Sequence, residues 1–94
     1  MHLYTINTDL SDIKFENIVV NGNTTKTFTF NTYGTIELFR PSSTEYAKYL
    51  IENGGVCTLV EGTAPQYATI SCSDRTVTIT ATASRAYFLF AMHN

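Results

Sequence analysis

The first residues whose chemistry can be weighed are the histidines and the aspartates. His2 and His93 lie at opposite ends of the chain, and because the termini of a domain often lie close together, a two-histidine metal site is one hypothesis. A closed zinc site needs further ligands, and no closely spaced Cys or His pair supplies them. Asp9 and Asp12 lack the fuller acidic spacing of a calcium loop and are typical of a turn. We interpret the histidines as exposed terminal residues, and the sequence predicts no metal site.

Cys57 and Cys72 each lie in a stretch that is typical of a strand. Unpaired Cys behaves as a small hydrophobe, and two cysteines without a secretion signal favour reduced thiols. We therefore expect buried free thiols, with a disulfide as the alternative. A nucleophilic Cys needs an adjacent base, and only the terminal histidines are candidates for it. The glutamates form no carboxylate pair in an apolar setting, so the sequence predicts no enzyme, no catalytic residue and no cofactor.

Charge and hydropathy exclude two classes of partner. The formal net charge is −2, and the six basic residues are scattered singly along the chain. Nucleic-acid binding needs clustered Lys and Arg, so we expect no nucleic-acid partner. The longest apolar run, residues 86–92, is far shorter than the roughly 20 residues of a membrane-spanning helix. The first residues show no signal peptide, so we expect no membrane partner and synthesis in the cytoplasm.

Threonine alternates with large apolar residues, as in residues 28–30 and 76–80. Successive side chains of a strand point to opposite faces, so this period of two predicts strands with one apolar face. Residues 3–8 form a first expected strand. Asn21-Gly22 predicts a hairpin that places Phe15 opposite Phe28, and Asp74-Arg75 predicts another that places Ile70 opposite Ile79. A three-residue loop at residues 33–35 is expected to join the strands on either side of it.

Residues 42–53 interrupt the strand pattern. Ser42 and Glu45 match a capping box, and Asn53-Gly54-Gly55 supplies a helix stop. Tyr46 and Leu50 would share one helical face. The sequence therefore predicts a short helix after Pro41, with a strand paired through an Asn53-Gly54 hairpin as the alternative.

Several short antiparallel strands separated by turns predict an all-β fold, a small antiparallel β-sandwich that spans residues 1–94 as a single domain. A small β-barrel is the alternative. In strand number and spacing the chain resembles immunoglobulin-type and jelly-roll-like sandwiches, although it has no Trp. The expected core contains the apolar residues of the two predicted hairpins: Phe15, Phe28, Phe30, Ile70, Val77 and Ile79.

The strand at residues 86–92 is apolar on both faces, although the core needs only one. We expect the face of Tyr87, Leu89 and Ala91 to contact a partner, with Tyr46 and Tyr49 as further interface residues because Tyr is favoured at interfaces. The low content of charged residues, 15%, also favours association. The hypothesis is a non-enzymatic structural module that self-associates as a homo-oligomer, such as a head-decoration or tail-fibre domain on a phage virion surface. The alternative is a carbohydrate- or ligand-binding module of an adhesin-like protein, with a glycan as partner.

Overall fold

The computed structural model describes residues 13–30, 33–52 and 55–94, and they form two antiparallel sheets. The expected strand at residues 3–8 and the Asp9 and Asp12 turn lie outside the described residues. Within them there is no helix long and apolar enough to cross a membrane. The eight strands are β1 (Lys14–Val20), β2 (Thr25–Thr29), β3 (Tyr33–Phe39), β4 (Tyr46–Glu52), β5 (Val56–Gly62), β6 (Ala68–Ser73), β7 (Thr76–Ala81) and β8 (Tyr87–His93).

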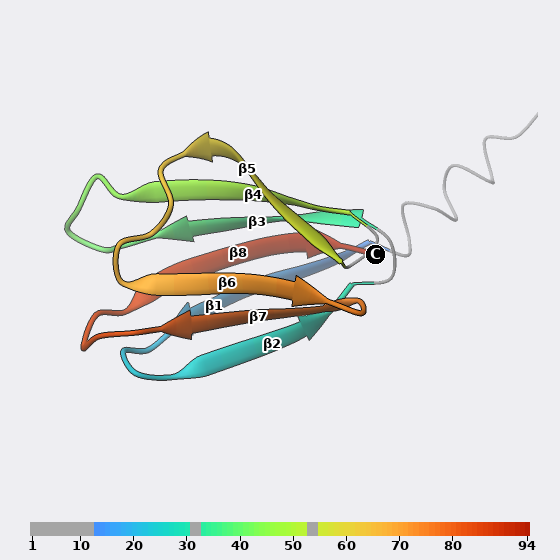
Figure 1. The fold of residues 1–94 in the computed structure, drawn as a ribbon. Helices are drawn as coiled ribbons and strands as arrows, with labels where there is room; N and C mark the ends of the chain where they lie inside the picture. Colours follow the sequence, from blue (N-terminus) through green and yellow to red (C-terminus); the bar gives the residue numbers. More distant parts are fainter. Residues whose placement is uncertain (1–12, 31–32, 53–54) are drawn as a thin grey trace, which may run out of the picture.

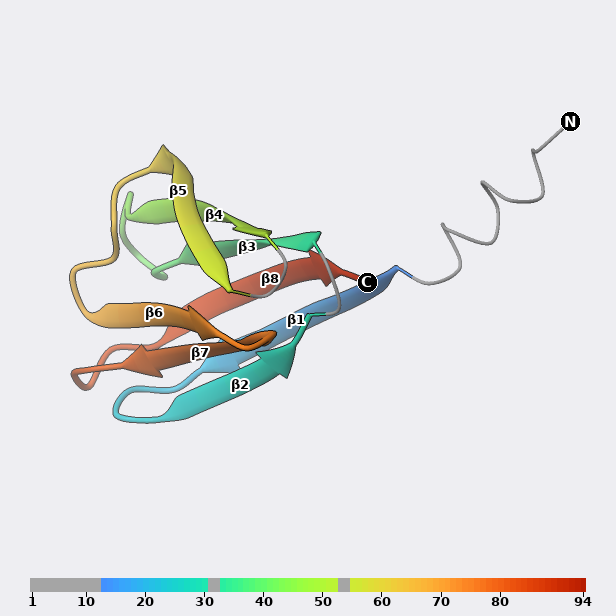
Figure 2. The same ribbon diagram turned by 45° about the vertical axis from the view of Figure 1, so that its right-hand side comes forward.

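The two sheets pack face to face as a sandwich (Figures 1 and 2). One sheet has the order β1-β8-β3-β4-β5 and the other the order β2-β7-β6. The apolar residues between them are almost fully buried because alternate side chains of each strand face the other sheet. This core contains Val20, Phe30, Ile36, Leu38, Ala47, Tyr49, Ile51, Ala68, Val77, Ile79, Ala81, Tyr87, Leu89 and Ala91. The prediction of an all-β sandwich is therefore confirmed.

The hairpin expected at Asn21-Gly22 is wrong, because the chain crosses from one sheet to the other at this point. β1 pairs with β8, and β2 pairs with β7. The residue with positive φ is Asn23, at 60°, so the two-residue hairpin turn does not form. A Cβ on Gly22 would lie 2.6 Å from the carbonyl oxygen of Ala83, and the glycine thus permits a close approach to the β7–β8 loop.

Of the other two expected turns, one is confirmed and one is wrong. The turn at Asp74-Arg75 is confirmed, with Ile70 opposite Ile79 and Cys72 opposite Val77. Asp74 and Arg75 both have positive φ, 49° and 63°, as a two-residue hairpin turn requires. The loop expected at residues 33–35 is wrong, since Tyr33 already begins β3, which pairs with β4 and β8 rather than with β2.

The short helix predicted after Pro41 is also wrong, and the alternative, a strand, is present as β4. Its side chains alternate between buried and half-buried, with Ala47, Tyr49 and Ile51 in the core. Lys48 interrupts the alternation of apolar and polar residues that is typical of a strand. In β4 it is nevertheless accommodated, because it lies opposite Glu37 on β3 and Glu61 on β5. The residues of the expected capping box are used otherwise: Ser42 has a φ of 60°, and Glu45 forms an ion pair with Arg40.

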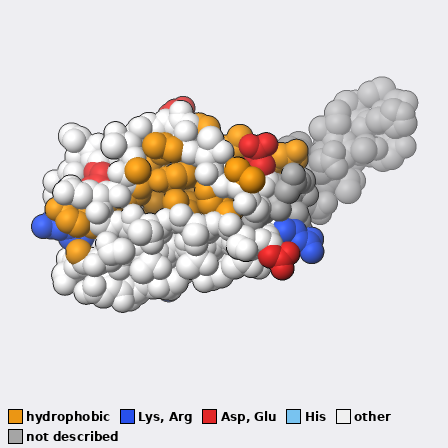
Figure 3. Space-filling view, viewed as in Figure 1, with side chains coloured by type: hydrophobic (Ala, Val, Ile, Leu, Met, Phe, Trp, Pro, Cys, Tyr) orange, Lys and Arg blue, Asp and Glu red, His pale blue; other side chains and the backbone are white. Residues whose placement is uncertain are grey.

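Cys57 and Cys72 form a disulfide, so the expectation of free thiols is wrong. The bridge joins β5 to β6, which are edge strands of the two different sheets. The sequence separation of 15 residues spans the crossing from one sheet to the other. Figure 3 shows hydrophobic atoms on this side of the molecule, where Leu59 of β5 remains 39% exposed. The disulfide therefore fastens the sandwich along a side that side-chain packing covers incompletely.

The core predicted from the sequence is right for three residues and wrong for one. Phe30, Val77 and Ile79 are fully buried, while Phe28 and Ile70 are partly buried against the core. Phe15 is 62% exposed because it lies on the outer face of β1. Phe15 therefore contributes to the exposed outer surface of the five-stranded sheet.

Candidate functional site

The outer face of the five-stranded sheet carries large apolar side chains around β8. Phe88, Phe90 and Met92 alternate with the core residues of this strand and are 49%, 38% and 39% exposed. A strand with apolar residues on both faces is suited to burial on both sides. Among the described residues, only the inner face is covered, by the three-stranded sheet.

Neighbouring strands extend this surface. Phe15 of β1 lies opposite Met92, and Val19 of β1 and Phe39 of β3 both lie opposite Phe88. The rings of Phe15 and Phe90 are 6.3 Å apart. We call the resulting surface the outer patch, and its members are Phe15, Val19, Phe39, Phe88, Phe90 and Met92, which are all exposed.

The outer patch is large for so small a protein. Four aromatic rings exposed by 38–62%, together with Val19 and Met92, present an apolar area on the order of 500 Å². That is near the upper end of the largest apolar patch on an ordinary monomer, about 300–600 Å². A stable interface buries about 800 Å² per partner, of which about 65% is apolar in homodimers. The outer patch therefore has the area of the apolar centre of such an interface.

Charged residues border the outer patch on its β4 and β5 side. Glu37, Lys48 and Glu61 lie in register on β3, β4 and β5. The hydroxyl of Tyr46 donates a hydrogen bond to Glu37 Oε2 at 2.8 Å, and this bond, with some burial, raises the pKa of Tyr46 to about 12. An apolar centre with a polar rim is the usual anatomy of a protein interface.

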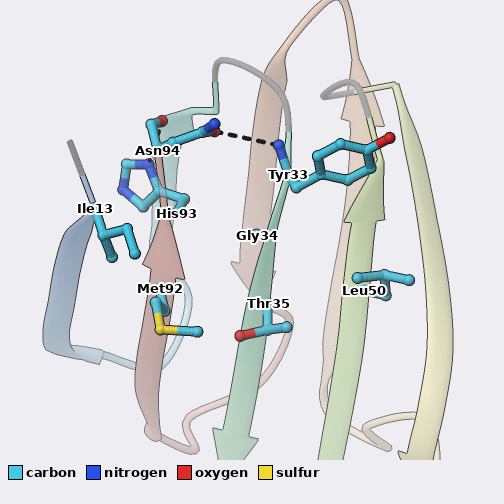
Figure 4. A pocket seen from close by; sticks show the side chains of 8 residues that line it. All are labelled: Ile13, Tyr33, Gly34, Thr35, Leu50, Met92, His93 and Asn94. Atoms are coloured by element: carbon cyan, nitrogen blue, oxygen red, sulfur yellow. Dashed lines mark hydrogen bonds between the residues drawn. The ribbon is translucent and has the colours of Figure 1, made fainter. Parts of the chain in front are cut away.

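Two hollows indent the face, each of about 370 Å³. The first lies within the outer patch, between Phe39, Phe88 and Phe90, with Asn17 and Glu37 at its edge. Figure 4 shows the second, where the short Thr35 side chain lies between Met92 and Leu50, and where Ile13 and Tyr33 stand on opposite sides. The N–H of Tyr33 donates a hydrogen bond to Asn94 Oδ1 at 3.2 Å.

The structure places the interface residues expected from the sequence differently. Tyr87, Leu89 and Ala91 are fully buried in the core, and Tyr49 is 6% exposed; only Tyr46, which is half-buried, reaches the outer face. On β8, the face that the described residues leave exposed is therefore the opposite one, which carries Phe88, Phe90 and Met92. Both faces are apolar, so composition alone could not distinguish them, and Asn17 and Glu37 opposite Phe90 are the polar neighbours that mark the outer side.

Of the two histidines considered for a metal site, the structure describes His93. His2 lies outside the described residues. His93 is 5% exposed, stacks on Phe30 with 4.3 Å between ring centroids, and contacts Glu16 Oε2 at 3.2 Å. It is thus no fraying terminal residue, contrary to the expectation. In the part of the chain that the structure describes, no three His, Cys, Asp or Glu residues are grouped for a metal.

Comparison with known proteins gives one informative likeness. No family model matches the chain, and no curated protein matches its sequence. Among solved structures, the fold is similar to part of the tailspike protein gp49 of Acinetobacter baumannii bacteriophage Fri1, which is described as a capsular polysaccharide depolymerase. The TM-score is 0.61 at 14% identity, over 88% of this chain and 18% of the tailspike chain. The likeness is one of fold, and this chain corresponds to less than a fifth of that protein's length.

Proposed function

We propose that this chain is a non-enzymatic structural module that self-associates through the outer patch. The observation that carries the proposal is the exposure of Phe15, Phe39, Phe88 and Phe90 on one sheet face. Leaving this surface in water is unfavourable, at about 25 cal/mol per Å², and the low content of charged residues in the chain, 15%, favours association.

A second copy of the chain is the occupant that fits this face best. The apolar area matches the centre of a standard interface, and the rim carries both signs of charge through Glu37 and Lys48. When two copies meet across a two-fold axis, the same patch serves both. The two hollows on this face can then receive side chains that project from the partner.

We further infer that the module belongs to a phage particle. Support comes from the likeness of its fold to a segment of a phage tailspike. The chemistry of the described residues agrees with a structural role, because both cysteines are in a disulfide and His93 is buried against Phe30. A module of this kind contributes rigidity and contacts to an assembly rather than a reaction.

The decisive experiment measures association of the whole chain by sedimentation velocity between low and high micromolar concentration. Wild type is expected to associate, and Phe88→Lys/Phe90→Lys is expected to be a folded monomer, because two charges on the outer patch prevent its burial. The matched control is Thr69→Lys/Ser71→Lys, which adds the same charges at exposed positions on β6 of the other sheet. The control should associate as wild type does. A wild type that stays monomeric throughout, or association retained by the Phe88/Phe90 variant, would overturn the proposal.

A further inference from the structure

Glu45 organises the end of the sandwich where the β3–β4, β5–β6 and β7–β8 loops lie (left in Figure 1). Its Oε2 accepts a hydrogen bond from Arg40 Nε at 2.6 Å. Its Oε1 accepts one from the Gln66 N–H at 2.8 Å and a short one from the Tyr87 hydroxyl. One carboxylate thus ties the β3–β4 loop to the β5–β6 loop and to the first residue of β8.

Tyr87 and Tyr67 complete this arrangement. Tyr87 is buried, and its hydroxyl oxygen accepts a hydrogen bond from the Tyr67 N–H at 3.0 Å. Burial, and then the bond to Glu45, raise the pKa of Tyr87 to about 12, so the hydroxyl keeps its proton at neutral pH. The Tyr67 backbone is therefore held in place from the core.

Two guanidinium groups approach the ring of Tyr67. The Cζ of Arg85 lies 4.4 Å from the ring centroid and that of Arg40 lies 5.3 Å from it. Cation–π contacts of this kind orient a guanidinium. Arg40 is neutralised by Glu45, whereas Arg85 has no ion pair with any residue in the described ranges 13–30, 33–52 and 55–94. The cluster of Arg40, Arg85 and Glu45 therefore carries one net positive charge on a protein whose overall charge is −2.

A hollow of about 240 Å³ opens beside these arginines, and it is lined by Arg40, Pro41, Ser84, Arg85 and Ala86. Figure 3 shows basic atoms next to hydrophobic atoms at this end of the molecule. The Arg40 hydrogen bonds shown by the structure use its Nε and its backbone N–H. The terminal nitrogens of the guanidinium make no hydrogen bond to the described residues.

We propose that this hollow binds the carboxylate of an acidic sugar, such as a uronic acid residue of a glycan. A guanidinium presents paired N–H donors that match a carboxylate, and the uncompensated charge of Arg85 balances one such group. Pro41 and Ala86 offer apolar surface to the C–H face of a sugar ring, and Ser84 offers a hydroxyl. A volume of about 240 Å³ suits one sugar residue better than an extended acidic peptide. Arg40 directly follows Phe39 of the outer patch, but no residue that lines the hollow belongs to that patch. The proposal does not depend on self-association.

The test is a titration of the isotopically labelled full chain, followed by NMR, with methyl glucuronide and with methyl glucoside. The two probes differ only in the carboxylate. We expect the glucuronide to shift the resonances of Ser84, Arg85 and Ala86, and the glucoside to leave them in place. Arg85→Ala should weaken glucuronide binding about tenfold, since a hydrogen-bonded charge pair is lost. Lys26→Ala removes the same charge from β2 and should bind as wild type does.

Three outcomes would overturn the proposal. Equal shifts with both sugars would show that the carboxylate is not recognised, and unchanged binding by Arg85→Ala would show that another site is responsible. Binding of an N-acetylglutamate amide as tight as that of the glucuronide would assign the hollow to any carboxylate, including one from a protein. Arg85 is exposed, so the Ala variant should remain folded, which an unchanged thermal midpoint verifies.

Discussion

Gly34 occupies a point where β3 passes directly against the ring of Phe30. A Cβ at this position would lie 2.4 Å from Phe30 Cε2 and 2.7 Å from the Met92 carbonyl oxygen. The backbone oxygen cannot move aside as a flexible side chain can. We therefore expect Gly34→Ala to destabilise the protein by about 1–3 kcal/mol, as overpacking of a core does.

Urea unfolding of the whole chain measures this effect. The matched control is Gly55→Ala, because among the described residues, its chain neighbours aside, no atom lies within 4 Å of the Cβ that would be added there. The control should keep the midpoint of wild type or raise it slightly, since Ala restricts the unfolded chain. Equal midpoints for the two variants would mean that Gly34 is not in tight contact with Phe30.

The carboxylate of Glu45 links stability to pH. Burial alone would raise its pKa, but the hydrogen bonds from Tyr87, Arg40 and the Gln66 N–H together lower the pKa below 4.5. Because the unfolded state binds the proton more tightly, the stabilisation is complete above the unfolded pKa and is lost as the pH falls through the folded pKa. Glu45→Gln should therefore be less stable than wild type at pH 7, and the difference should shrink as the pH falls below 4.5.

Thermal midpoints of both proteins across this pH range test the prediction. Glu61→Gln removes one negative charge from an exposed position on β5 and controls for a general change in charge. A Glu45→Gln curve that runs parallel to wild type down to low pH would contradict the assigned role of the carboxylate.

Among the strands, β5 and β6 depend most on a covalent bond. The disulfide between Cys57 and Cys72 closes a loop with a sequence separation of 15, and loops of about 15 residues are stabilised by about 3 kcal/mol when closed. We expect Cys57→Ala/Cys72→Ala to lose stability of this order, and we expect a reductant to do the same to wild type.

Denaturant unfolding with and without reductant is the measurement. The double variant serves as its own control, because reductant should not change its midpoint. If reductant left wild type unaffected and the double variant were equally stable, the two sheets would be held by packing alone.

The strands themselves were largely predictable, while their partners were not. The β6–β7 hairpin follows from local signals, namely a two-residue turn and matched alternation on both sides. The same alternation at β1 and β2 was satisfied by β8 and β7 instead, because a period of two fits any strand with the same pattern. The chain crosses from one sheet to the other at residues 21–24 because β1 pairs with β8 and β2 pairs with β7. Both partners are distant in sequence, so local signals do not predict the crossing.

The sequence predicts that β8 carries an exposed apolar face, but it does not predict which of its two faces that is. The two apolar faces of β8 differ little in composition, so the sequence indicates an apolar excess without showing which face is covered. Gly34, Ala47 and Ala91 lie on the inner face, where small residues let the sheets approach. The arginine cluster was missed because Arg40, Tyr67 and Arg85 are far apart in sequence and meet only through three loops.

For the molecule as a whole, the proposed self-association would add to the free energy of unfolding. Ninety-four residues form a small domain, and small domains bury less of their unfolded surface than large ones do. Covering the outer patch with a second copy would bury its apolar area and stabilise the folded state. Partners that bind only the folded chain make the thermal midpoint depend on concentration.

We therefore expect the thermal midpoint of wild type to rise by about 4 °C for each tenfold increase in protein concentration, the shift expected for a dimer of domains of this size. Calorimetry over two decades of concentration measures it. The midpoint of Phe88→Lys/Phe90→Lys should not change with concentration, since burying two ammonium groups in the interface is unfavourable. Thr69→Lys/Ser71→Lys should keep the full dependence, because the outer face of β6 lies on the other sheet. A concentration dependence in all three proteins would place the association on a surface other than the outer patch.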